Sequence, residues 1–216
     1  VCGKATRTSD YMMGKDKTYY TEMVFGKRYD TLDFSGKVID TSDKIIDESD
    51  LKKVIPDFIG EIEQIPPMYS ALKVDGKKLY DLAREGIEIE RKKRKVKVYD
   101  IKLLSFDFPK ASLEVKCSKG TYIRTLVDDI GQRLGSFAYV DSLTRKKVGL
   151  FDIKDAIKSE DLMKLDKEYL IDKMYPLDIA FDNFKRVDLD KNLLKKAING
   201  MVMEVDYLLD ETIRVY

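Results

Sequence analysis

The chain contains no histidine and no tryptophan, and only two of its 216 residues are cysteine, Cys2 and Cys117. These two cysteines lie far apart in the sequence, so the usual zinc-binding patterns and a Cys/His nucleophile pair are excluded. No apolar run approaches the roughly 18 residues that cross a bilayer, and the first residues do not resemble a signal peptide. We therefore expect a cytoplasmic protein that has no metal site and no membrane-spanning segment.

The chain also lacks an excess of charge of either sign. Lys and Arg number 40 and Asp and Glu number 39, which gives a net charge of +1 and no indication of a nucleic-acid partner. The distribution is uneven, because residues 70–97 hold ten basic and five acidic side chains, whereas residues 150–216 hold eleven and fifteen. A basic stripe is typical of a surface that binds phosphates. The alternative is an ordinary solvated segment.

Hydrophobic patterning predicts an α+β fold. Alternating apolar residues indicate several strands, and apolar residues at helical spacing indicate helices between them. The expected strands are 19–25, 96–101, 113–117 and 143–151, and the expected helices are 4–13, 51–59, 79–85, 126–134, 159–165 and 190–198. No regular β-α-β alternation is visible, so a mainly antiparallel sheet flanked by helices is favoured. A boundary at 176–188 would leave a small C-terminal unit.

The most specific local feature is Cys-Ser-Lys-Gly-Thr-Tyr-Ile-Arg-Thr-Leu at residues 117–126. A strand that enters a small-residue turn and then a helix would project Tyr122 and Arg124 at the mouth of the sheet. An arginine there can hold a carboxylate through two parallel hydrogen bonds, and a tyrosine can cover a base. The alternative is that Gly120 makes a tight turn, Tyr122 packs and Arg124 is solvated.

This segment resembles a conserved block of the TruB family of bacterial tRNA pseudouridine synthases, and further blocks agree in order. They are Gly3-Lys4-Ala5-Thr6, Asp16-Lys17-Thr18-Tyr19, Ile65 to Lys73 with Gly76 to Gly86, and Tyr139 to Arg145. The resemblance implies the pseudouridine-synthase fold. It predicts a partial catalytic domain at residues 1–180, with a thumb-like RNA-binding insertion at about 66–95. Residues 181–216 would begin a small PUA-like unit.

The resemblance also implies the function. It predicts isomerisation of a T-loop uridine of tRNA to pseudouridine, without metal or organic cofactor, by a monomer that flips the base out of its stack. Tyr19 and Arg124 are the expected catalytic residues, and Tyr19, Tyr122, Leu143 and Lys119 are expected to contact the uridine. The tRNA is expected to bind Lys73, Lys77, Lys78, Arg84, Arg91, Lys92, Lys93, Arg94 and Lys95. The alternatives are core packing for Tyr19 and Leu143 and plain solvation for each basic residue.

The attacking carboxylate is the difficulty. In the family it lies in a Gly-Thr-Leu-Asp-Pro segment that precedes the Gly-Lys-Ala-Thr block, and this chain begins after that point. Thr31-Leu32-Asp33 is a superficial match, but Phe34 stands where proline should, so Asp33 is rejected as the nucleophile. We therefore predict that Arg124 lacks the carboxylate partner expected from the family and that this chain alone is inactive, although the parent protein is an enzyme. A non-catalytic tRNA-binding or folding module and a structural, partner-binding protein are the alternatives.

Overall fold

The computed structural model describes residues 3–201 and 213–215, which belong to two compact units. The first, here called the sheet unit, comprises residues 14–156. The second, here called the terminal unit, combines residues 1–13 with residues 157–216. The predicted boundary near residue 180 rests on the family resemblance and stays a prediction.

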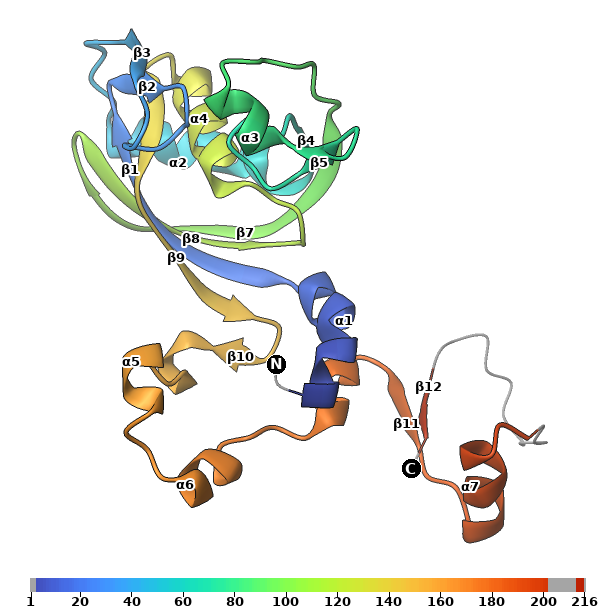
Figure 1. Cartoon of the computed structure of the whole chain (residues 1–216). Coiled ribbons are helices and arrows are strands. Elements are labelled where there is room, and N and C mark those ends of the chain that lie inside the picture. Colours follow the sequence, from blue (N-terminus) through green and yellow to red (C-terminus); the bar gives the residue numbers. More distant parts are fainter. Residues whose placement is uncertain (1–2, 202–212, 216) are drawn as a thin grey trace. The chain divides into compact units, whose positions relative to one another are not determined.

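An antiparallel sheet of six strands organises the sheet unit, in the order β10-β9-β1-β8-β7-β4 (Figure 1). The strands are β1 (Lys17–Phe25), β4 (Gly60–Gln64), β7 (Arg94–Asp107), β8 (Lys110–Cys117), β9 (Ala138–Val148) and β10 (Phe151–Asp152). Two short hairpins lie outside it, namely β2 (Lys27–Tyr29) with β3 (Val38–Thr41) and β5 (Lys73–Val74) with β6 (Lys77–Lys78). The predicted α+β class with a mainly antiparallel sheet is confirmed.

The helices of the sheet unit are α2 (Glu48–Val54), α3 (Leu79–Arg84) and α4 (Ile123–Leu134), together with two 3-10 turns, η2 (Ile55–Phe58) and η3 (Ile153–Asp155). The α-helix predicted through residue 59 ends at Val54, because Pro56 has no backbone N–H to donate and the chain tightens into a 3-10 turn. At the end of α4, Gly135 adopts the left-handed conformation that commonly ends a helix.

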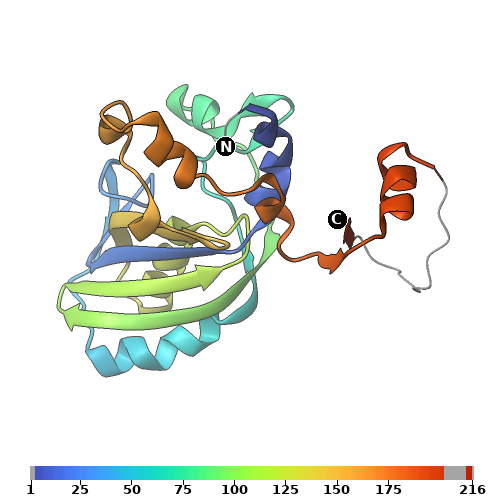
Figure 2. The same ribbon diagram turned by 90° about the horizontal axis from the view of Figure 1, so that it is seen from below.

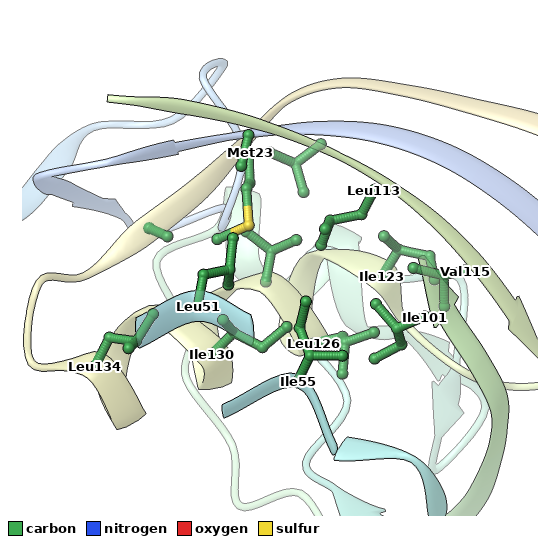
Figure 3. Packing of buried hydrophobic residues seen from close by; sticks show 14 of the residues in the cluster. Met23, Leu51, Ile55, Ile101, Leu113, Val115, Ile123, Leu126, Ile130 and Leu134 are labelled. Carbon is green, nitrogen blue, oxygen red and sulfur yellow. The ribbon is translucent and has the colours of Figure 1, made fainter. Parts of the chain in front are cut away.

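The main core lies between the sheet and the two helices α2 and α4, which cover the same face of it (Figures 1 and 2). Figure 3 shows Leu113 and Val115 of β8 facing Leu126 of α4, with Met23 of β1 close to Leu51 of α2. All five side chains are fully buried. This packing fixes the N-terminus of α4 over one face of β1 and β8. Arg124 belongs to the first turn of this helix.

The terminal unit contains short elements. They are η1 (Gly3–Thr8), α1 (Ser9–Gly14), α5 (Ser159–Leu162), α6 (Lys167–Asp172), η4 (Leu177–Phe181), β11 (Lys185–Val187), α7 (Lys191–Ile198) and β12 (Ile213–Val215). The rings of Tyr11, Phe181 and Phe184 pack on one another. The short apolar stretch that the sequence shows at 201–205 lies outside the described residues apart from Met201.

Candidate functional site

Strand register brings several predicted site residues to one face of the sheet. Tyr19 lies opposite Val115 on β8 and Arg145 on β9, and Thr21 lies opposite Leu143 of β9. Residues directly opposite one another in antiparallel strands project from the same face. Because Val115 is completely buried, this is the face covered by α4. Tyr19 is half-buried and packs against the edge of the core, while Leu143 is 43% exposed.

The electrostatic surroundings of Tyr19 keep its phenol protonated. Burial is the main cause that raises the pKa of Tyr19, and Arg145 opposes this shift without cancelling it. The pKa of neighbouring Lys17 is lowered, chiefly by burial and then by the positive charge of Arg145. The neutral ring of Tyr19 therefore lies at the margin of the core, with the cations Lys17 and Arg145 beside it. This arrangement suits a ligand that combines a planar ring with a phosphate.

The turn that begins α4 is fixed by a buried amide. Gln64, at the end of β4, is 2% exposed. Its Nε2 donates to the carbonyl oxygen of Tyr122 at 3.2 Å, and its Oε1 accepts from the Tyr122 backbone N–H at 3.0 Å. Gly120 takes φ +81°, a conformation that side chains rarely adopt. Tyr122 is half-buried and Lys119 is exposed, so both remain at the rim of this face.

Arg124 joins three segments that are remote in sequence. Its Nη1 donates to Asp33 Oδ2 at 2.9 Å and to the carbonyl oxygen of Thr31 at 3.0 Å, and its Nη2 donates to the carbonyl oxygen of Tyr69 at 2.6 Å. The side chains of Arg124 and Asp33 are each 22% exposed. Arg124 therefore has a carboxylate partner that the sequence did not indicate, because the loop after β2 folds back and presents Asp33 to it. The prediction that Arg124 lacks the aspartate of the Gly-Thr-Leu-Asp-Pro segment stays a prediction.

Asp33 is held as a carboxylate. Burial would raise its pKa, but hydrogen bonds from Ser35 and Thr31 and the charge of Arg124 outweigh burial and lower it. The loop is also joined to β9, because Phe34 donates its backbone N–H to the Val140 carbonyl at 3.2 Å. Asp33 consequently lies beside the strand that carries Leu143 and Arg145.

The thumb-like segment has a small core of its own. Met68, Leu79 and Leu82 are buried together, with Tyr69 and other apolar side chains packed around them. Above this core, Lys78 and Arg84 both contact the ring of Tyr80, with the Lys78 nitrogen at 5.2 Å and the Arg84 guanidinium carbon at 5.3 Å from its centre. Lys73 and Lys77 are exposed on the adjoining hairpin. Four of the predicted RNA-binding side chains therefore gather on one small subdomain.

Three of the five cations in the basic run from residue 91 to residue 95 form ion pairs with glutamates. Arg91 contacts Glu88 at 3.1 Å, Lys93 contacts Glu63 at 3.6 Å and Lys95 contacts Glu61 at 3.1 Å. Lys92 and Arg94 are exposed, and the structure gives neither an acidic partner among residues 3–201 and 213–215. These two side chains are the ones in the run that offer an unneutralised charge to a phosphate.

Sequence reasoning missed three contributors to this region, namely Asp33, Gln64 and Arg145. In the sequence, Asp33 is only a superficial match to the nucleophile motif, and neither Gln64 nor Arg145 has a predicted role. Across residues 3–201 and 213–215, no group of three or more Cys, Asp or Glu side chains is arranged to hold a metal ion. Within the same residues, no helix has both the length and the apolar character needed to cross a membrane.

Comparisons with known proteins agree with one another. Residues 1–123 match the family model described as TruB family pseudouridylate synthase (N terminal domain), and residues 124–182 match the tRNA pseudouridylate synthase B C-terminal domain. The chain is 42% identical to tRNA pseudouridine synthase B of Clostridium kluyveri over 98% of this chain and 72% of that protein. For the protein of the same name from Borreliella burgdorferi the identity is 39%, over 97% of this chain and 72% of that protein.

Solved structures share the fold. A chain of a Cbf5-Nop10-Gar1 complex matches with a TM-score of 0.70 and 24% identity, over 93% of this chain and 53% of that chain. A chain of an H/ACA RNP bound to a substrate RNA matches with a TM-score of 0.65 and 21% identity, over 94% and 53%. At this level of identity the likeness concerns the architecture of the sheet and its helices.

Proposed function

Because the chain belongs to the TruB family of pseudouridylate synthases, we propose that its parent protein isomerises a T-loop uridine of tRNA to pseudouridine. The observation that carries the assignment of its site is the gathering of Tyr19, Leu143 and the start of α4 on one face of the sheet. The alternative of a non-catalytic tRNA-binding module is not favoured, because the matched relatives are named as synthases.

The proposed site binds a uridine that has left its stack. The everted base lies on the neutral ring of Tyr19, and Leu143 provides an apolar contact at the opening. Arg145 and Lys17 are placed to bind the phosphate of the flipped nucleotide, since both cations share the face of the sheet with Tyr19. Tyr122 and Lys119 contact the same nucleotide from the turn before α4.

In this proposal Arg124 is the cation that binds the reacting carboxylate of the parent protein, and Asp33 is a positioning residue that acts through Arg124. A guanidinium fixed by three acceptors is preorganised, which is the arrangement that stabilises developing negative charge most effectively. The inactivity predicted for these 216 residues alone stays a prediction. A monomeric, cytoplasmic protein that needs no cofactor is likewise proposed, on the basis of the family.

RNA would be held mainly by the thumb-like segment and by the two exposed cations at its end, Lys92 and Arg94. A T-stem-loop presents closely spaced phosphates, and each cation that neutralises one releases condensed counterions. The proposal assigns a smaller part to Arg91, Lys93 and Lys95, because a glutamate already neutralises each of them.

The experiment that tests the site compares two adjacent tyrosines of β1. Tyr19→Leu should weaken binding of a fluorescein-labelled T-stem-loop RNA about tenfold, because one base–aromatic stack contributes about 1–3 kcal/mol. Tyr20→Leu is the matched control, since Tyr20 projects from the opposite face and hydrogen-bonds Ser112 at 3.2 Å. Fluorescence anisotropy gives both affinities, and pseudouridine is detected by primer extension after carbodiimide treatment.

Equal affinities for the wild type and Tyr19→Leu would discredit Tyr19 as the base platform. A larger loss in Tyr20→Leu would place the RNA on the other face of the sheet. Pseudouridine formed by the unsubstituted 216-residue chain would overturn the predicted inactivity but not the assignment of Tyr19, so the two parts of the proposal are tested separately.

A further inference from the structure

The sheet unit contains a second site-like feature, a cleft of about 790 Å³ that neither Tyr19 nor Arg124 lines. One wall is α4, which contributes Thr125, Asp128, Asp129 and Gln132. The opposite walls come from residues 28–39 and from the thumb-like segment. Three large apolar side chains that line it, Ile39, Ile65 and Ile87, are exposed to solvent rather than packed. We call this feature the acidic cleft.

Charges in the acidic cleft do not balance. Five acidic and three basic side chains line it: Asp30, Glu63, Glu88, Asp128 and Asp129, against Arg28, Arg91 and Lys93. Each basic residue already pairs with a lining carboxylate, at 2.8 Å for Arg28 with Asp128, 3.1 Å for Arg91 with Glu88 and 3.6 Å for Lys93 with Glu63. Two carboxylates, Asp30 and Asp129, are left over. Asp30 accepts the backbone N–H of Lys37 at 2.8 Å.

Asp129 is the lining carboxylate that has no direct partner among the described residues. It is half-buried, and within residues 3–201 and 213–215 the structure gives it neither a hydrogen bond nor an ion pair. Burial, and then the charge of Asp128, raise its pKa to about 6, against the smaller opposite effect of Arg28. A carboxylate in such a place is normally paired, because burying an unpaired charge is costly.

Two further polar atoms of side chains that line the acidic cleft, the Thr125 hydroxyl and Arg91 Nε, also have no hydrogen-bond partner among the residues that the structure describes. Thr125 is only 6% exposed, and its hydroxyl is buried without a hydrogen bond in the described part of the chain. Thr125 and Asp129 are four residues apart on α4 and therefore lie on the same side of the helix. Buried hydroxyls nearly always have a partner, so a donor that reaches both groups would satisfy them together.

We propose that the acidic cleft binds an organic cation, a primary ammonium or guanidinium on an apolar stem. The charged head donates hydrogen bonds to the Asp129 carboxylate and to the Thr125 hydroxyl, and the stem covers the exposed isoleucines. A metal ion fits less well, because two of the three carboxylates nearest α4 and β2 are already engaged with Arg28 and a backbone amide. A phosphate is disfavoured by the excess of acidic groups. The cation can belong to a polypeptide side chain or to a free polyamine.

Isothermal titration calorimetry of the whole chain at pH 7.5 tests this inference with three probes. Agmatine and spermidine represent free amines, and the blocked peptide acetyl-Leu-Arg-Leu-amide represents a side chain in a polypeptide; acetyl-Leu-Gln-Leu-amide is the neutral control. We expect at least one cationic probe to bind and the neutral peptide not to bind. Binding by the peptide alone identifies a polypeptide source, and binding by the amines alone identifies a free ligand; both results support the site.

Asp129→Asn should weaken the interaction by about tenfold or more, because it removes a charge-assisted hydrogen bond. Glu160→Gln, an equally conservative change at an exposed carboxylate of the terminal unit, should leave it unchanged. If no cationic probe binds, or if Asp129→Asn and Glu160→Gln have equal effects, the inference is wrong. Should Asp129→Asn fail to fold, carbon NMR of the wild-type Asp129 carboxyl decides: a bound cation must lower its pKa, and an unchanged pKa overturns the proposal.

Discussion

Replacing Arg124 should reveal how much of the sheet unit depends on one guanidinium. The side chain donates to an aspartate and two backbone carbonyls, which come from the loop after β2 and from the thumb-like segment. Hydrogen bonds that involve a charged group contribute about 1.5–3 kcal/mol each, and the pair is 22% exposed on both sides, which reduces that value. We expect Arg124→Ala to lower the free energy of unfolding by about 2–4 kcal/mol.

The measurement is urea denaturation followed by circular dichroism and by tyrosine fluorescence, since the chain has 13 tyrosines and no tryptophan. A double-mutant cycle with Asp33→Asn isolates the ion pair and should give a coupling of about 1–2 kcal/mol at pH 7. Because the pKa of Asp33 is lowered in the folded chain, this coupling is present above its ordinary pKa and is lost as the pH falls through the lower folded value.

The same helix offers a matched control in Arg133, which contacts Asp57 at 3.3 Å. Its side chain is 65% exposed and that of Asp57 is 53% exposed, so Arg133→Ala should cost less than about 1 kcal/mol. An effect of Arg124→Ala no larger than that of Arg133→Ala would refute the reasoning. So would a coupling between Arg124 and Asp33 that is close to zero.

Three further outcomes follow from local geometry. Gly131→Ala should destabilise the chain by at least about 1–3 kcal/mol in urea denaturation, because the new Cβ would lie 2.3 Å from a backbone nitrogen of β9; Gly14→Ala, with nothing within 4 Å, is the control. Asp129 has its pKa raised to about 6 by burial and by the adjacent carboxylate, so its contribution to stability is lost as the pH rises from 4 to above 6. Asp129→Asn should therefore stabilise by about 1–2 kcal/mol at pH 8 and hardly at pH 4. The double substitution Lys92→Gln and Arg94→Gln should lower the number of phosphate contacts in the T-stem-loop complex by about one to two. This number follows from the salt dependence of the binding constant, measured by anisotropy between 50 and 200 mM salt.

The elements that pack both sides of the core were predictable from the sequence. The alternation in β8 and the helical spacing in α4 both reflect burial against the same core, so the pattern and the structure coincide. The prediction of helices and strands failed where most residues of an element are exposed, because the sequence then shows no periodic apolar pattern. Helix α6 (Lys167–Asp172) buries none of its residues and was missed, although Asp166 caps it by accepting from Tyr169 at 2.7 Å. Strand β7 extends to Asp107, well beyond the predicted Ile101, through residues that mostly face solvent.

The site was less predictable than the fold for a physical reason. Tyr19 and Arg124 lie in recognisable motifs, so the family resemblance could indicate them. The residues that orient this region come from distant parts of the chain. Asp33, the partner of Arg124, is 91 residues away from it, and Gln64, the partner of Tyr122, is 58 residues away. No local periodicity reports such a contact. The signal available in the sequence for Gln64 was an amide side chain two residues before Pro66-Pro67.

The contacts of Asp33 give a reason, independent of the motif, why it is a poor choice as the attacking carboxylate. Its Oδ1 accepts from the Thr31 hydroxyl and from the backbone and side chain of Ser35, while its Oδ2 accepts from Arg124. Donors that stabilise the ionised form lower the pKa, and they also occupy the lone pairs that an attack on carbon requires. A carboxylate held in this way orients a guanidinium well and attacks poorly. In the proposed function, the attack on the uridine is therefore assigned to a carboxylate other than Asp33.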